Sequence, residues 1–418
     1  MRTDNDEIRR TLYQIYACNR QSPGTIGIWR GLALGLLATT AIATSAHADA
    51  LSTPSMTAPL SANASPTSFD GGPLGKVYVT GQLSGLGMAQ SNRAPSPFAG
   101  NSTSVLDLSN GQVEVQTTSG PIQFYVQAGA YSLPALGAPY IHVGKAVSQN
   151  YGAVPVAYAK AVLTPEISVQ AGALPTLIGA EYTFTFQNMN IERGLLWNQE
   201  PAVSKGVQVN YSKGPLSASV SINDGYDSDH YNWVSGLATY TINPSNTLAF
   251  AAGGNFSHTY DTKFVAPVYQ GNSSIYNLIY TYTQGPLTVN PYFQYSHVDS
   301  RPDIGIYKSA STYSGAVLAK YTLTPVFSLA GRVEYVSSSS TGCGAGDSLA
   351  CTPTNLLYGP GSDAWSVTVT PTYQKGIFFA RGEVSYTGIS HLTPGDGFGS
   401  DANAKSQVRG LIETGLLF

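Results

Sequence analysis

Charged side chains are scarce in this chain. Asp, Glu, Lys and Arg make up 11% of its 418 residues, against about 25% in a typical soluble protein. A surface so poor in charge would not keep a large monomer soluble. The formal net charge is −3, and this acidic balance argues against a nucleic-acid partner, which would require a basic stripe.

A hydrophobic run long enough for a transmembrane helix is also missing near the start. The apolar run Gly31 to Ile42 follows Arg30 and is shorter than the roughly 20 residues that span a bilayer as a helix. It leads to Ala46-His47-Ala48, a sequence of small residues typical of a signal-peptide cleavage site. We therefore predict a secretory signal peptide over residues 1–48 in place of a membrane anchor.

Cysteine is equally rare, with three in the chain. Cys18 lies in the predicted signal peptide, whereas Cys343 and Cys351 lie in a stretch rich in Gly and Ser. In an oxidising compartment such a pair forms a disulfide that pinches one surface loop. A zinc site needs about four ligands, and no second pair lies nearby. The sequence therefore predicts a disulfide, no metal site and no cofactor.

Glycine and aromatic residues are abundant instead, with Gly 44, Tyr 27 and Phe 14. This excess favours an all-β architecture. The segment from Ala50 to Gly75 is different, because it is rich in Ser, Pro, Ala and Thr and carries a single charge, Asp70. Its composition and lack of periodicity predict a flexible periplasmic leader over residues 49–75.

A repeated unit occupies residues 76–418. It consists of an alternating segment, a tight turn with Pro or Gly, and another alternating segment. Pro presets the backbone angle φ and Gly tolerates positive φ, so both form turns. The turns fall at Gly120-Pro121, Thr164-Pro165, Gly214-Pro215, Asn243-Pro244, Gly285-Pro286, Thr324-Pro325 and Lys375-Gly376. Seven turns, with an opening and a closing strand, predict a transmembrane antiparallel β-barrel of about sixteen strands with short periplasmic turns and long outer loops.

The segments alternate between an apolar and a polar face. From Leu216 to Ile222 the even-numbered residues are apolar and the odd-numbered ones are serines. The closing segment, Gln407 to Phe418, alternates in the same way and ends on an aromatic residue. One face of each strand therefore suits lipid and the other suits water. Phe418 matches the terminal aromatic residue of bacterial outer-membrane barrels as a class, and the barrel-assembly machinery is an expected partner.

Tyrosines add evidence that these strands cross a membrane. Five of them precede a short turn by two to four residues: Tyr211, Tyr240, Tyr282, Tyr321 and Tyr373. This offset is typical of the aromatic girdle at a membrane interface. A soluble sandwich or a β-solenoid, the alternative folds, has no reason to repeat it.

One predicted outer loop, Leu174 to Val203, carries a family resemblance. Ala171 to Thr176, Ile178 to Glu181, and NMNIERGLL from Asn188 to Leu196 resemble the putative beta-barrel porin-2 (OmpL-like) family of bacterial outer-membrane proteins. The resemblance implies a porin-like barrel in the bacterial outer membrane that lets small hydrophilic solutes cross. It brings no catalytic residues and no particular solute, and it makes a homotrimer reasonable without requiring one.

A barrel of about sixteen strands encloses a lumen too wide for side chains to fill, so something must narrow it. The loop from Leu174 to Val203 mixes aromatic residues with charges, and aromatic residues in a long loop must be buried against something. We predict that it folds inward, and that the constriction contains Glu181, Glu192, Arg193 and Glu200. The alternative is an outward loop that caps the barrel or touches a neighbouring subunit.

Charged residues on the polar face of the last strands form a second candidate set for the pore lining: Lys320, Arg332, Glu334, Arg381, Glu383, Arg409 and Glu413. Ionisable groups that face a lumen can set ion selectivity through their local field. The alternative is mutual pairing across strands, for example of Arg381 with Glu413. The mixture of signs predicts a weakly selective pore.

Other functions have weaker signals in the sequence than the channel. Asp224, Asp227 and Asp229 lack the spacing and the closing Glu of a calcium loop, so we expect a solvated loop there. Five histidines follow the signal peptide, but the nucleophile-elbow phrase G-x-S-x-G is missing, so no enzyme activity is expected and a hydrolase is a minor alternative. An adhesion or surface-structure protein with a plugged lumen is the other alternative.

Overall fold

The computed structural model describes residues 60–95, 101–260 and 267–418. The predicted signal peptide over residues 1–48, and the leader before residue 60, lie outside the described residues. In the described part of the chain, none of the helices has the length and the hydropathy that a membrane-spanning helix needs.

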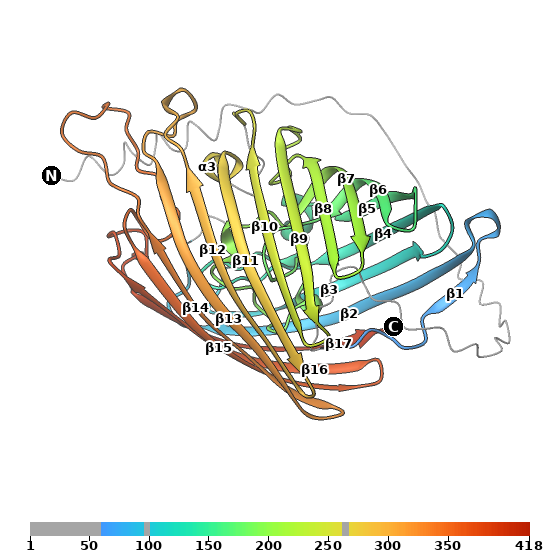
Figure 1. The fold of residues 1–418 in the computed structure, drawn as a ribbon. Helices are drawn as coiled ribbons and strands as arrows, with labels where there is room; N and C mark the ends of the chain where they lie inside the picture. Colours follow the sequence, from blue (N-terminus) through green and yellow to red (C-terminus); the bar gives the residue numbers. More distant parts are fainter. Residues whose placement is uncertain (1–59, 96–100, 261–266) are drawn as a thin grey trace, which may run out of the picture. The chain divides into compact units, whose positions relative to one another are not determined.

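Across the residues that the structure describes, seventeen strands form one sheet, whose arrangement Figure 1 shows. The first, β1 (Thr67–Asp70), is short and pairs with the beginning of β2. The barrel strands are β2 (Lys76–Gln90), β3 (Ser104–Thr117), β4 (Ile122–Tyr131), β5 (Val156–Val162), β6 (Ile167–Pro175), β7 (Val203–Lys213), β8 (Leu216–Asn223), β9 (Trp233–Asn243), β10 (Asn246–Asn255), β11 (Ser273–Gln284), β12 (Leu287–Val298), β13 (Ala310–Thr324), β14 (Phe327–Ser338), β15 (Asp363–Lys375), β16 (Phe378–Ser390) and β17 (Ser406–Leu417).

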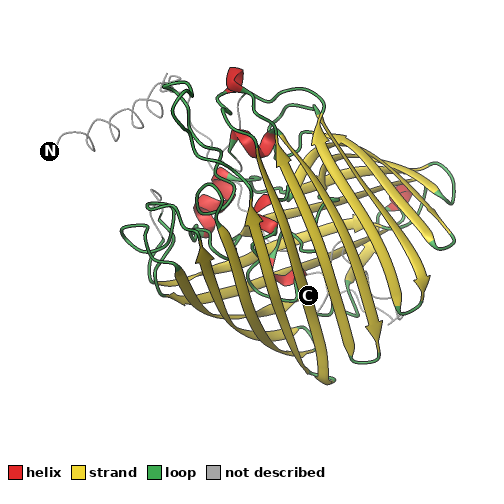
Figure 2. Ribbon diagram, turned by 60° about the vertical axis from the view of Figure 1, so that its left-hand side comes forward, coloured by secondary structure: helices red, strands yellow, loops and turns green. Residues whose placement is uncertain are grey.

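Every strand from β2 to β17 pairs antiparallel with its neighbours in sequence, and β17 pairs with β2. The sheet therefore closes into a sixteen-stranded antiparallel barrel, which confirms the predicted fold class. Closure leaves no free strand edge, as a barrel in hydrocarbon requires. Each of the seven predicted turns joins two successive strands of this barrel. The long connections lie at the opposite end (Figure 2).

The short helices of the described residues lie in these connections, except the first, which lies between β1 and β2. They comprise the α-helices α2 (Val143–Gln149) and α3 (Val268–Gly271) and the 3₁₀ helices η1 (Gly72–Leu74), η2 (Thr185–Gln187), η3 (Trp197–Gln199) and η4 (Pro302–Ile304).

The two faces of the strands differ as the alternation predicts. On β15, Trp365, Val367 and Val369 are exposed on the outside, whereas Ser366 and Thr368 between them are at most 1% exposed. The outer face of a lone barrel counts as exposed, and in a membrane that face meets lipid. The outward-facing apolar side chains of β15 therefore meet lipid.

The chain terminus closes the barrel. Phe418 exchanges two backbone hydrogen bonds with Gly81 on β2, at 2.7 and 2.9 Å. A Cβ atom built on Gly81 would lie 2.6 Å from the Phe418 ring, so only glycine lets the ring lie this close. The last residue is thus part of the seam between the first and the last barrel strand.

The second half of the predicted leader has regular structure. Residues 67–70 form β1, which pairs with Lys76 to Val79 of β2, and η1 follows directly. Pairing of β1 with β2 continues the sheet beyond the point where β17 ends. The leader is therefore attached to the turn end of the barrel before the first full strand begins.

Candidate functional site

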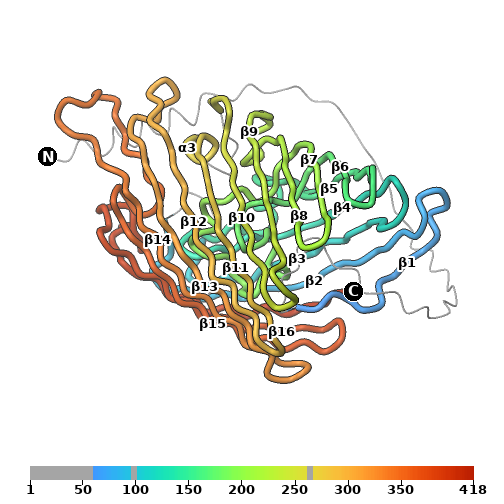
Figure 3. Tube along the Cα trace, in the orientation of Figure 1, coloured from blue at the N-terminus to red at the C-terminus, as the bar shows by residue number. Residues whose placement is uncertain are grey.

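The connection between β6 and β7, residues 176–202, is the third outer loop. Figure 3 shows its trace within the ring of strands. Its side chains and backbone hydrogen-bond to lumen-facing side chains of β14, β16 and β17. We call the lumen-facing charged residues of these strands the charged wall: Arg332, Glu334, Arg381, Glu383, Arg409 and Glu413.

Glu181 of the loop is joined to β14. The Arg332 guanidinium lies 2.5 Å from the Glu181 carboxylate and 3.1 Å from that of Glu334. Arg332 also donates to the backbone carbonyl of Glu192 at 2.8 Å, while the second oxygen of Glu181 accepts the Gly194 N–H at 2.7 Å. Arg332 therefore holds two carboxylates and one loop carbonyl at once.

Glu192 of the loop is joined to β17 and β16. Its carboxylate pairs with Arg409 at 2.7 Å, and Arg409 also donates to the Ala135 carbonyl of the second outer loop at 2.7 Å. Glu383 accepts the N–H groups of Ile191 and Glu192 at 2.5 and 3.0 Å. Arg409 thus ties two outer loops to one strand, a contact that sequence reasoning missed because Ala135 carries no polar side chain.

Arg381 and Glu413 form an ion pair across β16 and β17. This is the mutual pairing that the sequence left as an alternative. Both also contact the loop, because Thr185 donates to Glu413 at 2.7 Å and Arg381 donates to the carbonyls of Thr185 and Asn188. The pair therefore orders the wall and holds the loop.

Two predicted loop residues have fewer partners. The Arg193 guanidinium stacks over the Trp197 ring, 5.0 Å from its centroid, and its nitrogens have no hydrogen-bond partner among the described residues. Glu200 accepts the Tyr292 hydroxyl at 2.5 Å. Lys320 lies apart from these contacts, near the short turns, and is half-buried.

Gly194 explains why the loop can come so close to the charged wall. A Cβ atom there would lie 2.0 Å from a Glu334 carboxylate oxygen and 2.8 Å from one of Glu181. Glycine is therefore required at this close approach. The charged wall is at most 2% exposed, and buried charges are tolerated only when they are paired and hydrogen-bonded.

The opposite part of the lumen has a different surface. A cavity of about 540 Å³ lies between the third outer loop and lumen-facing side chains of β3 to β7. We call its carboxamide residues the amide wall: Gln116, Gln123, Gln170, Gln208 and Asn210. Sequence reasoning missed this set, although these residues occupy the polar face of alternating strands and could have been found there.

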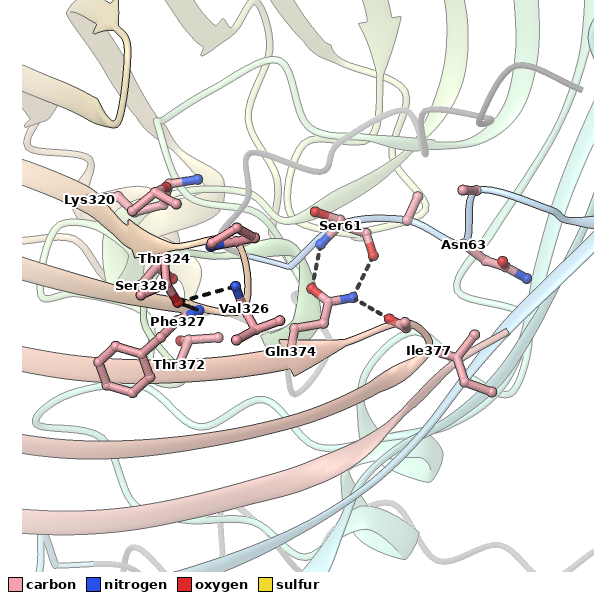
Figure 4. A pocket seen from close by; sticks show the side chains of 15 residues that line it. Ser61, Asn63, Lys320, Thr324, Val326, Phe327, Ser328, Thr372, Gln374 and Ile377 are labelled. Carbon is pink, nitrogen blue, oxygen red and sulfur yellow. Dashed lines mark hydrogen bonds between the residues drawn. The ribbon is translucent and has the colours of Figure 1, made fainter. Parts of the chain in front are cut away.

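The leader crosses the turn end of the barrel beside β15. Ser61 and Gln374 exchange two hydrogen bonds, from Ser61 N to Gln374 Oε1 at 2.8 Å and from Gln374 Nε2 to Ser61 O at 2.9 Å. Figure 4 shows this pair beside a pocket that Lys320 also lines. Leu60 is 1% exposed and belongs to a buried cluster with the lumen-facing Phe379 and Leu417. The leader thus covers part of the lumen at this end.

The predictions for the outer loops had mixed outcomes. Cys343 and Cys351 form a disulfide, as predicted. The expectation of a solvated loop at Asp224, Asp227 and Asp229 is wrong for the first two, which are 1% and 3% exposed. Lys205 pairs with Asp227 at 2.6 Å and with Asp229 at 2.7 Å, so a lysine occupies the place that a cation would take.

Comparison with known proteins agrees with this architecture. The sequence profile of the putative beta-barrel porin-2, OmpL-like family matches residues 76–418. Outer-membrane-expressed OmpT of Vibrio cholerae is 13% identical with a TM-score of 0.51, over 82% of this chain and 98% of that one. Salmonella typhi OmpF, solved in complex with daunomycin, is 13% identical with a TM-score of 0.51, over 84% of this chain and 100% of that one.

At this identity the two structures show the fold alone, and no curated protein matches the sequence. The family profile spans most of the chain and the whole barrel. The chain therefore belongs to the putative beta-barrel porin-2, OmpL-like family and is a porin-like β-barrel of the bacterial outer membrane.

Proposed function

We propose that the protein is a passive diffusion channel for small hydrophilic solutes or ions, with a water-filled lumen narrowed by the third outer loop. Glu181, Glu192, Arg193 and Glu200 belong to the narrowing loop, and the charged wall holds it. The observation that carries the proposal is the set of ion pairs between loop and wall, of Glu181 with Arg332 and of Glu192 with Arg409.

The size of the barrel makes such a loop necessary. Sixteen strands enclose a lumen that side chains of the wall alone do not fill. A loop held only by apolar packing could adopt several positions, because apolar contacts are not directional. Buried ion pairs fix one geometry, since removing either partner leaves an uncompensated charge. The loop therefore sets a constant pore size.

Conductance in planar bilayers tests the proposal. The mature protein is expected to give stable single-channel currents, and reversal potentials in asymmetric salt measure its ion preference. Deletion of Gln187 to Asn198 is expected to raise the single-channel conductance. An unchanged conductance after this deletion would show that the loop does not set the pore. A protein with no current and no liposome swelling in graded sugars would instead be a plugged barrel with a role in adhesion or surface structure.

The channel carries out no chemical reaction in this proposal, but one contact favours a hydrolase as the second candidate. His297 on β12 contacts the Ser311 hydroxyl at 2.7 Å and the Asp299 carboxylate at 3.2 Å. Serine, imidazole and carboxylate in this order are the groups of a hydrolytic triad. Asp299 is 66% exposed, however, and a carboxylate in water orients an imidazole weakly.

Phospholipid hydrolysis by the purified protein separates the two candidates. We expect the wild type and Ser311→Ala to give the same background rate. A rate above background that Ser311→Ala abolishes would establish the hydrolase.

Assembly as a homotrimer and insertion by the barrel-assembly machinery complete the proposal. Cross-linking in the membrane tests the oligomeric state.

A further inference from the structure

The cavity beside the amide wall has a chemistry of its own. Among the described residues that line it, Lys160 is the only charged side chain, and the others are mostly carboxamides, hydroxyl groups and tyrosines. Glu114 on β3 is 1% exposed and does not line the cavity. The charged wall, in contrast, is covered by the loop. The accessible surface of this part of the lumen is therefore nearly neutral and rich in groups that hydrogen-bond.

Three of the five carboxamides form a connected row. Gln208 donates to Asn210 at 2.6 Å, and Asn210 donates to Gln170 at 3.3 Å. Gln116 lines the same cavity and is 6% exposed, yet its Nε2 group has no hydrogen-bond partner in the part of the chain that the structure describes. A buried donor without a partner costs about 1–3 kcal/mol. The Gln116 amide therefore has to turn towards the cavity before a solute or a water molecule can accept from its Nε2 group.

Aromatic rings line the same space. Tyr125 and Tyr158 stack with their centroids 5.5 Å apart and their planes at 20°. Tyr182 comes from the third outer loop, where the Asn188 side chain holds its backbone through two hydrogen bonds of 2.7 and 2.8 Å. Tyrosine offers an apolar ring face together with a polar hydroxyl edge. Tyr158 and Tyr182 thus add ring surface to a wall of donors and acceptors, and Tyr125, which is 3% exposed, supports Tyr158 from behind.

We propose that this cavity binds neutral polyhydroxylated solutes, saccharides of one or two rings, during their passage. The inference rests on the proposed channel function and names its solute class. A sugar hydroxyl both donates and accepts, and carboxamides provide both partners. The face of a sugar ring is lined by C–H groups and packs on a tyrosine ring. The volume of about 540 Å³ lies within the range of ligand pockets, about 300–1,000 Å³.

Block of the ion current by added solute tests this inference. With the full mature protein in planar bilayers, sucrose is expected to reduce the current in a saturable way, whereas gluconate at the same concentration is expected to give no saturable block. Tyr158→Ala is expected to weaken the sucrose block by about 2- to 10-fold, the loss of one aromatic contact. Tyr240→Ala is the matched control, because Tyr240 is exposed on the outer face of β9.

A second variant keeps the test decisive if Tyr158→Ala does not fold. Gln208→Leu removes one carboxamide from the row and is expected to weaken the block in the same direction. A conducting wild type that sucrose does not block, or that gluconate blocks equally, would overturn the solute class and leave the channel intact. Equal sucrose block in Tyr158→Ala and Tyr240→Ala would show that the cavity beside the amide wall is not where sucrose binds. A protein that carries no current would remove the channel function, and this inference with it.

Discussion

The charged wall and the amide wall face the same lumen but differ in what holds them. On the charged wall, Arg332, Arg381 and Arg409 each pair with a carboxylate and also donate to a loop carbonyl. On the amide wall, Gln208 and Asn210 bond mainly to each other and to neighbouring strands. Ion pairs fix a covering segment in place, whereas carboxamides leave a surface open. One wall therefore anchors the loop, and the other borders the cavity through which we propose that solutes pass.

Removal of one cation from the charged wall should have the largest effect. Arg332→Leu leaves Glu181 and Glu334 buried without their partner, and we expect a loss of about 3–5 kcal/mol of stability. The loop should then move, so single-channel conductance should rise and its noise should increase. Thermal unfolding in detergent and single-channel recording measure the two effects.

The matched change on the amide wall sharpens this contrast. Gln208→Leu removes one hydrogen bond to Asn210, which keeps the Ser219 hydroxyl at 2.8 Å, so we expect a loss of about 1 kcal/mol. Arg301→Leu is the control for loss of an arginine, because its contact with Asp299 is exposed and 3.8 Å long. Equal destabilisation by Arg332→Leu and Gln208→Leu would contradict the distinction between the walls.

Gly194→Ala should separate the loop from the charged wall without removing a charge. The added methyl group would collide with the Glu334 and Glu181 carboxylates, and overpacking of this kind costs about 1–3 kcal/mol. We expect a larger or less uniform conductance than in the wild type. Gly144→Ala is the matched control, because nothing lies within 4 Å of a Cβ atom at Gly144. Identical channels from both variants would show that the close approach is unimportant.

The leader at the turn end should have a smaller effect. Gln374→Ala removes both hydrogen bonds to the Ser61 backbone, about 1 kcal/mol each. Residues 60–64 should then be cleaved faster by added protease, with a modest rise in conductance. Lys375→Ala changes the neighbouring residue, which points outward, and should leave the cleavage rate unchanged. Equal cleavage rates in the two variants would mean that Gln374 does not hold the leader.

The disulfide should have the smallest effect on the lumen. Cys343 and Cys351 close a short segment of the loop between β14 and β15, and both lie outside the strands. We expect Cys343→Ser to leave conductance and sucrose block unchanged, because the two cysteines belong to neither the charged wall nor the amide wall. A change in either quantity would require a role for this loop in the pore.

The fold was predictable from local signals. Alternation such as that from Leu216 to Ile222 predicts strands with one lipid face and one lumen face. The seven Pro or Gly turns predict that successive strands pair antiparallel. The pairing of Arg381 with Glu413 was open, since the register between β16 and β17 follows from a turn whose geometry the sequence gives only approximately. The hydrogen bonds from Arg409 to the backbone carbonyls of Ala135 and Ala138 were not predictable, because a backbone carbonyl carries no sequence signature.

The sequence by itself determined a barrel in the outer membrane, its strand count, its turns and which side chains face lipid. Those properties follow from the period of two and from turn chemistry, both of which are local. Only the tertiary structure decided which charges are covered and which surface stays open. Arg332 and Gln208 both lie on the polar face of a strand. The third outer loop covers Arg332 and leaves Gln208 beside a cavity. Which of them is covered depends on where the loop lies in space, because ion pairing and close approach join residues that are far apart in sequence.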